Sequence, residues 1–128
     1  LRVHHDLANS VLLPHTIKYN GVEDPSRFNP LMPGSRYIAH ERYQEIAGSL
    51  GLPCKSPEQG LESLLNAINN LQMDFNLPRT FRDCEIDKQE YLAKVEQMAE
   101  QVFEDHSTAT NPRPPLIKEI MEIYETLY

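Results

Sequence analysis

Residues 56–75, SPEQGLESLLNAINNLQMDF, carry the clearest helical pattern in the chain. Ser56 is a typical N-cap, Pro57 suits the first helical position, and Gln59 completes an S-x-x-Q capping box. Apolar residues then recur at intervals of three and four, which places them along one face of a helix. They are Leu61, Leu64, Leu65, Ile68, Leu71 and Phe75. This stretch predicts an amphipathic helix that packs against other helices.

The first twenty residues form a second apolar pattern with helical spacing. Asp6 is placed to cap its start, because a short acidic side chain accepts hydrogen bonds from the free amides of a first turn. Pro14 has no amide hydrogen and its ring crowds the preceding turn, so we expect a kink there or a break into two shorter helices. The apolar positions are Leu7, Ala8, Val11, Leu12 and Ile17.

Three further helices are expected, at about 37–50, 87–103 and 115–128. Gly51 suits the position just after the first of them, and Glu90 follows an aspartate in a capping pattern at the start of the second. The residues expected to face inward are Ile38, Ile46, Ala47 and Leu50, then Leu92, Val95, Met98, Ala99, Val102 and Phe103, and finally Leu116, Ile117, Ile120, Ile123, Tyr124 and Leu127.

Two proline-rich stretches separate these helices. Residues 21–36 hold three prolines and two glycines, and residues 107–115, STATNPRPP, hold three prolines. Both are predicted to be loops, because proline cannot continue a helix. No segment alternates apolar and polar residues for long, so the pattern typical of strands is missing. We therefore predict an all-α bundle of about five or more helices, in a single domain over residues 1–128.

The composition excludes several classes of function. The net charge is −7 and no lysine- or arginine-rich block occurs, so a nucleic-acid partner is not expected. No apolar stretch approaches the ~20 residues that cross a bilayer, and no signal peptide leads the chain, so we expect no membrane partner. The two cysteines are far apart and form no CxxC pair. They indicate reduced thiols in a cytoplasmic protein.

The histidines are the remaining candidates for chemistry, because the common phosphate-binding, nucleophile and zinc motifs are all missing. They are His4, His5, His15, His40 and His106. Two nitrogens that ligate one metal ion lie within roughly 4 Å of each other. On a continuous helix His5 and His15 are separated by about 15 Å of rise, so these two cannot share an ion. By composition alone, a histidine at a helix start is most often a solvated polar residue.

Several segments resemble the iron-containing (group III) alcohol dehydrogenases. HDLANSVLLPHTIKYN (5–20) is similar to that family's segment P-H-G-L-A-N-A-x-x-L-P-x-V-x-x-Y-N. ERYQEIAGSLGL (41–52) resembles the family's next helix, and residues 75–124 resemble its closing third. The pattern D-x-x-T-x-x-N-P-R-x-P-L-I (105–117) is most similar to the alcohol dehydrogenase half of bifunctional aldehyde–alcohol dehydrogenases. The resemblance covers essentially the whole chain in collinear order.

The resemblance implies a fold, a reaction and two site residues. Such enzymes bind NAD(P) in an N-terminal α/β domain and hold Fe(II), with zinc as an alternative, through one aspartate and three histidines of a helical C-terminal domain. The ion polarises the alcohol oxygen while hydride passes to the nicotinamide. The histidine of P-H-G falls on His5, so the other ligands and the cofactor domain are expected before Leu1.

By the same resemblance, Ser107 takes the position of a cysteine that faces the substrate pocket, and 111–113 a structural role in joining two helices. The full-length enzyme is expected to be a homo-oligomer that interconverts short-chain aldehydes and primary alcohols with NAD(H). This 128-residue part alone is expected to be inactive.

Departures from the family pattern leave a second hypothesis open. Three glycines of the family are replaced here by Asp6, Glu85 and Ala109, and the proline before the ligand histidine by His4. Either the site has diverged or the backbone turns are of a different kind. The second hypothesis is that the chain is a non-catalytic helical module, for oligomerisation or partner binding, derived from the dehydrogenase fold.

Overall fold

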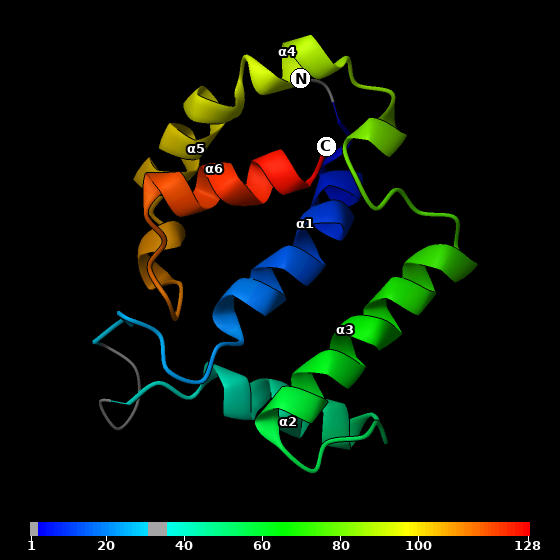
Figure 1. Ribbon diagram of the computed structural model, residues 1–128, viewed down its shortest axis with the longest axis vertical. Coiled ribbons are helices and arrows are strands. Elements are labelled where there is room, and N and C mark those ends of the chain that lie inside the picture. The colour runs from blue at the N-terminus through cyan, green and yellow to red at the C-terminus, as the bar shows by residue number, and fades with distance from the viewer. Residues whose placement is uncertain (1–2, 31–35) are drawn as a thin grey trace.

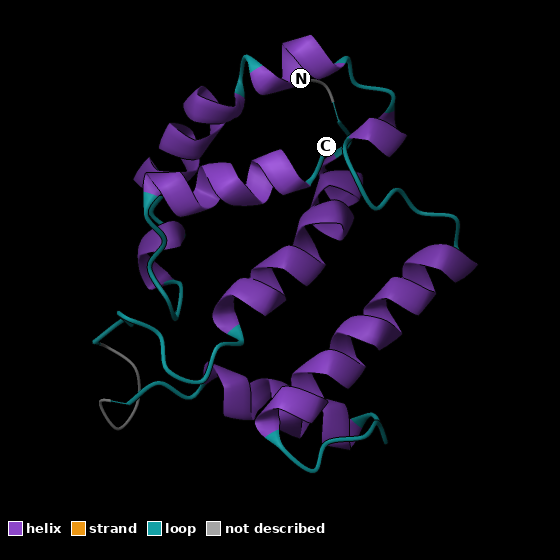
Figure 2. Cartoon of the chain, in the orientation of Figure 1, coloured by secondary structure: helices purple, strands orange, loops and turns teal. Residues whose placement is uncertain are grey.

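The computed structural model describes residues 3–30 and 36–128, and within these ranges the chain contains helices and loops but no strand (Figure 2). None of the described helices is long and apolar enough to cross a membrane. The all-α prediction is therefore confirmed. The elements are α1 (His5–Asn20), α2 (Ala39–Ser49), α3 (Pro57–Asp74), η2 (Arg82–Cys84), α4 (Lys88–Leu92), α5 (Val95–Glu104), η3 (Thr108–Thr110) and α6 (Ile117–Thr126).

Helix α1 runs without interruption through Pro14, so of the two predicted outcomes, a kink or a break, the break was wrong. Proline leaves the carbonyl of Ser10 without its usual amide partner, four residues along the helix. The side-chain amide of Gln72, on α3, donates to that carbonyl at 2.7 Å. The prediction that Asp6 caps the helix was also wrong, because His4 holds the N-cap position and Asp6 lies in the first turn.

The predicted caps of two other helices are confirmed. The Ser56 hydroxyl accepts a hydrogen bond from the Gln59 amide at 3.2 Å, and the Asp87 carboxylate accepts one from the Glu90 amide at 2.9 Å. The Gln59 side chain does not return to Ser56 but accepts from the amide of Lys55, one residue earlier, at 2.8 Å. Both helices thus begin where local sequence places them.

Helices α2 and α3 pack tightly against each other at the base of the molecule (Figure 1). Gly60 permits this approach, because a Cβ at that position would lie 2.7 Å from the Cα of Gln44. Gly51 ends the preceding helix with a φ of +71°, as predicted for a residue in the C′ position.

The apolar face of α3 is only partly covered. Leu64 is buried against α1 and α2, but Leu71 is 55% exposed and Phe75 is 70% exposed. Figure 1 shows α3 beside α1, with its C-terminal turns extending away from α2. On α2, Ala47 is buried as predicted, whereas Ile46 and Leu50 face solvent, contrary to the prediction.

The predicted helix over 87–103 is two helices. The repeat is interrupted at Ala93 and Lys94, where the Lys94 amide bonds to the carbonyl of Tyr91, three residues back. Tyr91 is fully buried, and its hydroxyl donates to the backbone carbonyl of Tyr124 at 2.7 Å. The inward positions predicted for this region are correct for Val95 and Ala99 but wrong for Leu92 and Phe103, which are about half exposed.

Helix α1 is the element that joins the two parts of the core. One cluster of buried residues combines Val11 of α1 with side chains from the C-terminal half, and another combines Ile17 of α1 with α2 and α3. The members of the first are Val11, Phe81, Tyr91, Val95 and Leu127, and those of the second are Ile17, Ala47 and Leu64. The position of α1, and of any residue on its first turn, therefore depends on both core clusters.

Candidate functional site

His5 and Ser107 line the same cavity, although they are more than a hundred residues apart in the chain. This His5 cavity has a volume of about 730 Å³. Its walls come from the first turns of α1, the end of α5, the turn before η3 and the side of α6. The lining residues are His5, Asn9, Met98, Gln101, Val102, Asp105, Ser107, Thr108 and Tyr124.

His5 presents an imidazole nitrogen as a hydrogen-bond acceptor. Its Nε2 lies 3.0 Å from the side-chain amide nitrogen of Asn9, one turn further along α1. Because an amide nitrogen can only donate, Nε2 accepts this hydrogen bond with its lone pair, and a metal ion bound at Nε2 would have to replace the Asn9 contact. The neighbouring His4 contacts the Asp6 carboxylate at 3.5 Å on an exposed surface outside the cavity lining.

Within residues 3–30 and 36–128, no group of three or more histidine, cysteine, aspartate or glutamate side chains comes together as a metal site. A metal ion at the predicted ligand His5 would therefore need its other ligands from outside the described residues. His15 does not line the His5 cavity; it lies in grooves against α3 and α6. Burial first, and Lys18 second, lower the pKa of His15 below its usual value.

Ser107 is held by its neighbour two residues back. Its amide donates to the Asp105 carboxylate at 2.7 Å. This backbone bond, together with one from the Ser107 hydroxyl, lowers the pKa of Asp105. The next residue, Thr108, donates its hydroxyl to the carbonyl of Val102 at 2.5 Å and so ties the turn to the end of α5. These hydrogen bonds hold Ser107 in place at the cavity wall.

The N-P-R motif connects η3 and α6 to the C-terminal end of α1. The side-chain amides of Asn20 and Asn111 exchange two hydrogen bonds of 3.0 and 2.8 Å. Arg113 donates to the backbone carbonyl of Tyr19 at 3.0 Å, and its guanidinium lies 4.0 Å from the centre of the Tyr19 ring. The structural role predicted for this motif is confirmed, with α1 as an additional partner.

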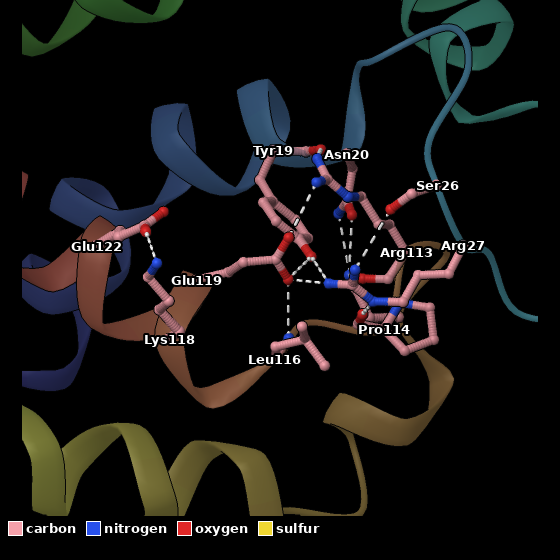
Figure 3. A network of polar contacts seen from close by, with 11 residues as sticks. Tyr19, Asn20, Ser26, Arg27, Arg113, Pro114, Leu116, Lys118, Glu119 and Glu122 are labelled. Atoms are coloured by element: carbon pink, nitrogen blue, oxygen red, sulfur yellow. Dashed lines mark hydrogen bonds and ion pairs between the residues drawn. The ribbon is translucent and has the colours of Figure 1, made fainter.

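Glu119 is the centre of the polar network around this junction (Figure 3). It accepts hydrogen bonds from the Tyr19 hydroxyl and the Leu116 amide, each at 2.8 Å, and forms ion pairs with Arg27 and Arg113. Burial alone would raise the pKa of Glu119, but these donors and cations together lower it. Burial, followed by the bond to Glu119, raises the pKa of Tyr19 to about 12.

Sequence reasoning did not predict this network. The motifs that contain Tyr19 and Arg113 were both recognised, but nothing in the local pattern shows that they meet. Arg27 lies outside the segments that resemble the family and Glu119 lies inside the last of them, and their pairing follows from the fold.

The three residues that replace family glycines differ in backbone conformation. Glu85 adopts φ +59° and ψ +29°, the left-handed conformation that glycine tolerates best. Asp6 lies in the first turn of α1, and Ala109 lies within the 3₁₀ turn η3, where its carbonyl accepts from the Asn29 side chain at 3.0 Å. The glycine-like turn is therefore kept only at position 85 of these three.

Comparisons with known proteins agree over the whole chain. The protein-family model described as "Fe-containing alcohol dehydrogenase family, C-terminal" matches residues 1–128. An aldehyde-alcohol dehydrogenase of Streptococcus pneumoniae serotype 2 is 36% identical over 97% of this chain and 14% of its own length. The bifunctional aldehyde-alcohol dehydrogenase AdhE of Escherichia coli is 33% identical over the same shares, 97% and 14%.

A solved structure gives the same result. The crystal structure of a 1,3-propanediol oxidoreductase superposes with a TM-score of 0.76 at 26% identity, over 98% of this chain and 28% of that one. The chain thus spans only a small part of the relatives that it matches.

Proposed function

Because the chain belongs to the iron-containing alcohol dehydrogenase family, we propose that it is the C-terminal part of an enzyme that interconverts short-chain aldehydes and primary alcohols with NAD(H). One observation carries the proposal. The two residues that the family pattern assigns to metal and substrate, His5 and Ser107, line one cavity. The aldehyde-alcohol dehydrogenases at 33–36% identity support the substrate class.

In this proposal His5 is one metal ligand, and the remaining ligands and the cofactor domain precede Leu1. Iron, or zinc as an alternative, would act as a Lewis acid on the alcohol oxygen while NAD(H) exchanges hydride. The 3.0 Å contact with Asn9 sets the orientation of the His5 ring, and the metal ion would replace Asn9 at Nε2.

Ser107 contributes a short, oriented wall to the substrate end of the cavity. Its bonds to Asp105 commit the serine amide and hydroxyl to the protein. We therefore assign Ser107 a steric role and no transfer of a proton.

The decisive experiment compares His5→Ala with His15→Ala in the full-length protein. His5 is exposed and precedes the buried positions of α1, so its loss opens no core cavity. We expect His5→Ala to lose most of the metal and nearly all alcohol oxidation while its circular dichroism spectrum is unchanged. His15→Ala should retain both metal and turnover. Metal content and turnover of His5→Ala equal to wild type would refute the assignment.

The isolated 128-residue chain offers a second test of the ligand assignment. A single histidine with water in the other positions gives little affinity, so iron or zinc should bind weakly. Tight stoichiometric binding in a titration would contradict the proposal. It would point instead to a separate site, such as His4 with Asp6.

The alternative function, a non-catalytic oligomerisation or partner module, is favoured by one observation. Leu71 and Phe75, four residues apart and so on one face at the C-terminal end of α3, are 55% and 70% exposed. Such a face is also suited to the homo-oligomer that we propose for the cytoplasmic enzyme. The residues that precede Leu1 distinguish the two functions. A D-x-x-x-H motif and a further histidine support the enzyme, and their absence supports the module.

A further inference from the structure

A second cavity adjoins the His5 cavity and extends along α1 towards the opposite end of that helix. It has a volume of about 290 Å³ and shares four wall residues with the His5 cavity: Val102, Ser107, Thr108 and Tyr124. Its remaining walls come from α1, the N-P-R loop and α6. They are Leu12, Thr16, Tyr19, Asn111, Pro115, Ile120 and Ile123. We refer to it as the tail cavity.

The walls of the tail cavity provide apolar contact more than hydrogen bonding. The hydroxyls of Thr16 and Thr108 donate to backbone carbonyls at 3.2 and 2.5 Å, and the Tyr19 hydroxyl donates to Glu119 at 2.8 Å. The Asn111 amide is engaged in the exchange with Asn20. Because these polar groups already have partners, the surface left for a ligand is chiefly aliphatic and aromatic. Pockets lined mainly by aliphatic and aromatic side chains suit the hydrocarbon part of a ligand.

We propose that the tail cavity receives the hydrocarbon chain of primary alcohols and aldehydes whose oxygen lies at His5. This inference rests on the proposed function and extends its substrates beyond short chains. A short-chain substrate would occupy the His5 cavity alone, whereas a longer one would pass Ser107 and enter the tail cavity. Ser107 stands at the boundary because it lines both cavities.

The helix rise sets the chain length at which the tail cavity is reached. Leu12 and Thr16 follow His5 by seven and eleven residues, which corresponds to about 10 and 16 Å along α1. An extended alkyl chain advances about 1.3 Å per carbon, from a carbon–carbon bond of about 1.5 Å. Substrates of about eight carbons or more would therefore contact the walls near Leu12, and ethanol would not.

The kinetic test narrows the tail cavity in the full-length enzyme. Thr16→Trp places a large ring at an exposed position of its wall, where the native side chain bonds only to its own helix. Each buried methylene is worth about fourfold in affinity. We expect kcat/KM for 1-decanol to fall at least tenfold, and that for ethanol to stay within twofold. Lys18→Trp is the matched control, because Lys18 is exposed on the same helix and lines neither cavity.

Equal effects of Thr16→Trp on ethanol and 1-decanol, or an equal selective loss in Lys18→Trp, would overturn the proposal. A binding measurement tests it independently of activity. In the metal-free full-length protein, 1-decanol should shift the methyl resonances of Ile120 and Ile123 in wild type, and ethanol should not. Unshifted methyls would overturn the tail cavity even if His5→Ala behaves as proposed. If His5→Ala fails and the methyls still shift, the proposed function falls and the cavity stands.

Discussion

The bond between Gln72 and the helix that contains Pro14 can be measured with a double-mutant cycle. The Gln72 amide donates to the Ser10 carbonyl at 2.7 Å, in place of the amide hydrogen that proline lacks. Replacing Gln72 with methionine keeps the volume and removes the donor. An unsatisfied buried carbonyl costs about 1–3 kcal/mol. Part of that cost is offset, because the same substitution removes the buried Gln72 side-chain oxygen, which has no hydrogen-bond partner. We expect a net loss of about 1 kcal/mol.

The second arm of the cycle repeats the change in a Pro14→Ala background. Alanine restores an amide hydrogen to the Ser10 carbonyl, so Gln72→Met should then cost close to nothing. The coupling energy is therefore about 1 kcal/mol, equivalent to about 4 °C in the midpoint of thermal unfolding. The assay is urea unfolding followed by circular dichroism, with Gln97→Met as an exposed glutamine control. Costs of Gln72→Met that agree in the two backgrounds to within about 0.3 kcal/mol would refute the reasoning.

Three further changes test other parts of the structure. Glu85→Gly should raise the free energy of unfolding by about 1 kcal/mol, because Glu85 has a left-handed φ of +59° that glycine adopts without strain. Asn76→Gly, at φ +51°, should raise it much less, because asparagine already tolerates this conformation. Urea midpoints of the two variants measure the difference, and equal gains would contradict it. Ser56→Ala should cost about 1 kcal/mol in thermal unfolding through loss of the α3 cap; an unchanged midpoint would show that the cap contributes nothing. The folded state lowers the pKa of Glu119 below 4.5, so its stabilisation is complete above that pH and is lost as pH falls through the folded pKa. Below pH 4.5 wild type should lose stability more steeply than Glu119→Gln in acid titrations of unfolding, and parallel curves would count against the network.

The starts of two helices were predictable because their signals are local. Ser56 and Asp87 each bond to an amide three residues along the chain, so a short stretch of sequence contains both partners. Gly51 is a similar case, since its backbone conformation depends on its own missing side chain. The family pattern predicted His5 and Ser107 as site residues, and in the structure both line one cavity.

Contacts between residues that are distant in the chain determine the features that local sequence did not predict. Local rules predict that Pro14 interrupts its helix, but Gln72, 62 residues from Ser10, supplies the missing donor. The stripe on α3 looks uniformly buried in sequence, yet α1 and α2 cover Leu64 and leave Phe75 exposed. Hydrophobic spacing sets which side chains share a helix face; the neighbouring helices determine how much of that face loses its water. Sequence alone therefore determined where helical segments lie, and only the tertiary structure decided their continuity, their burial and the meeting of the two residues predicted for the site.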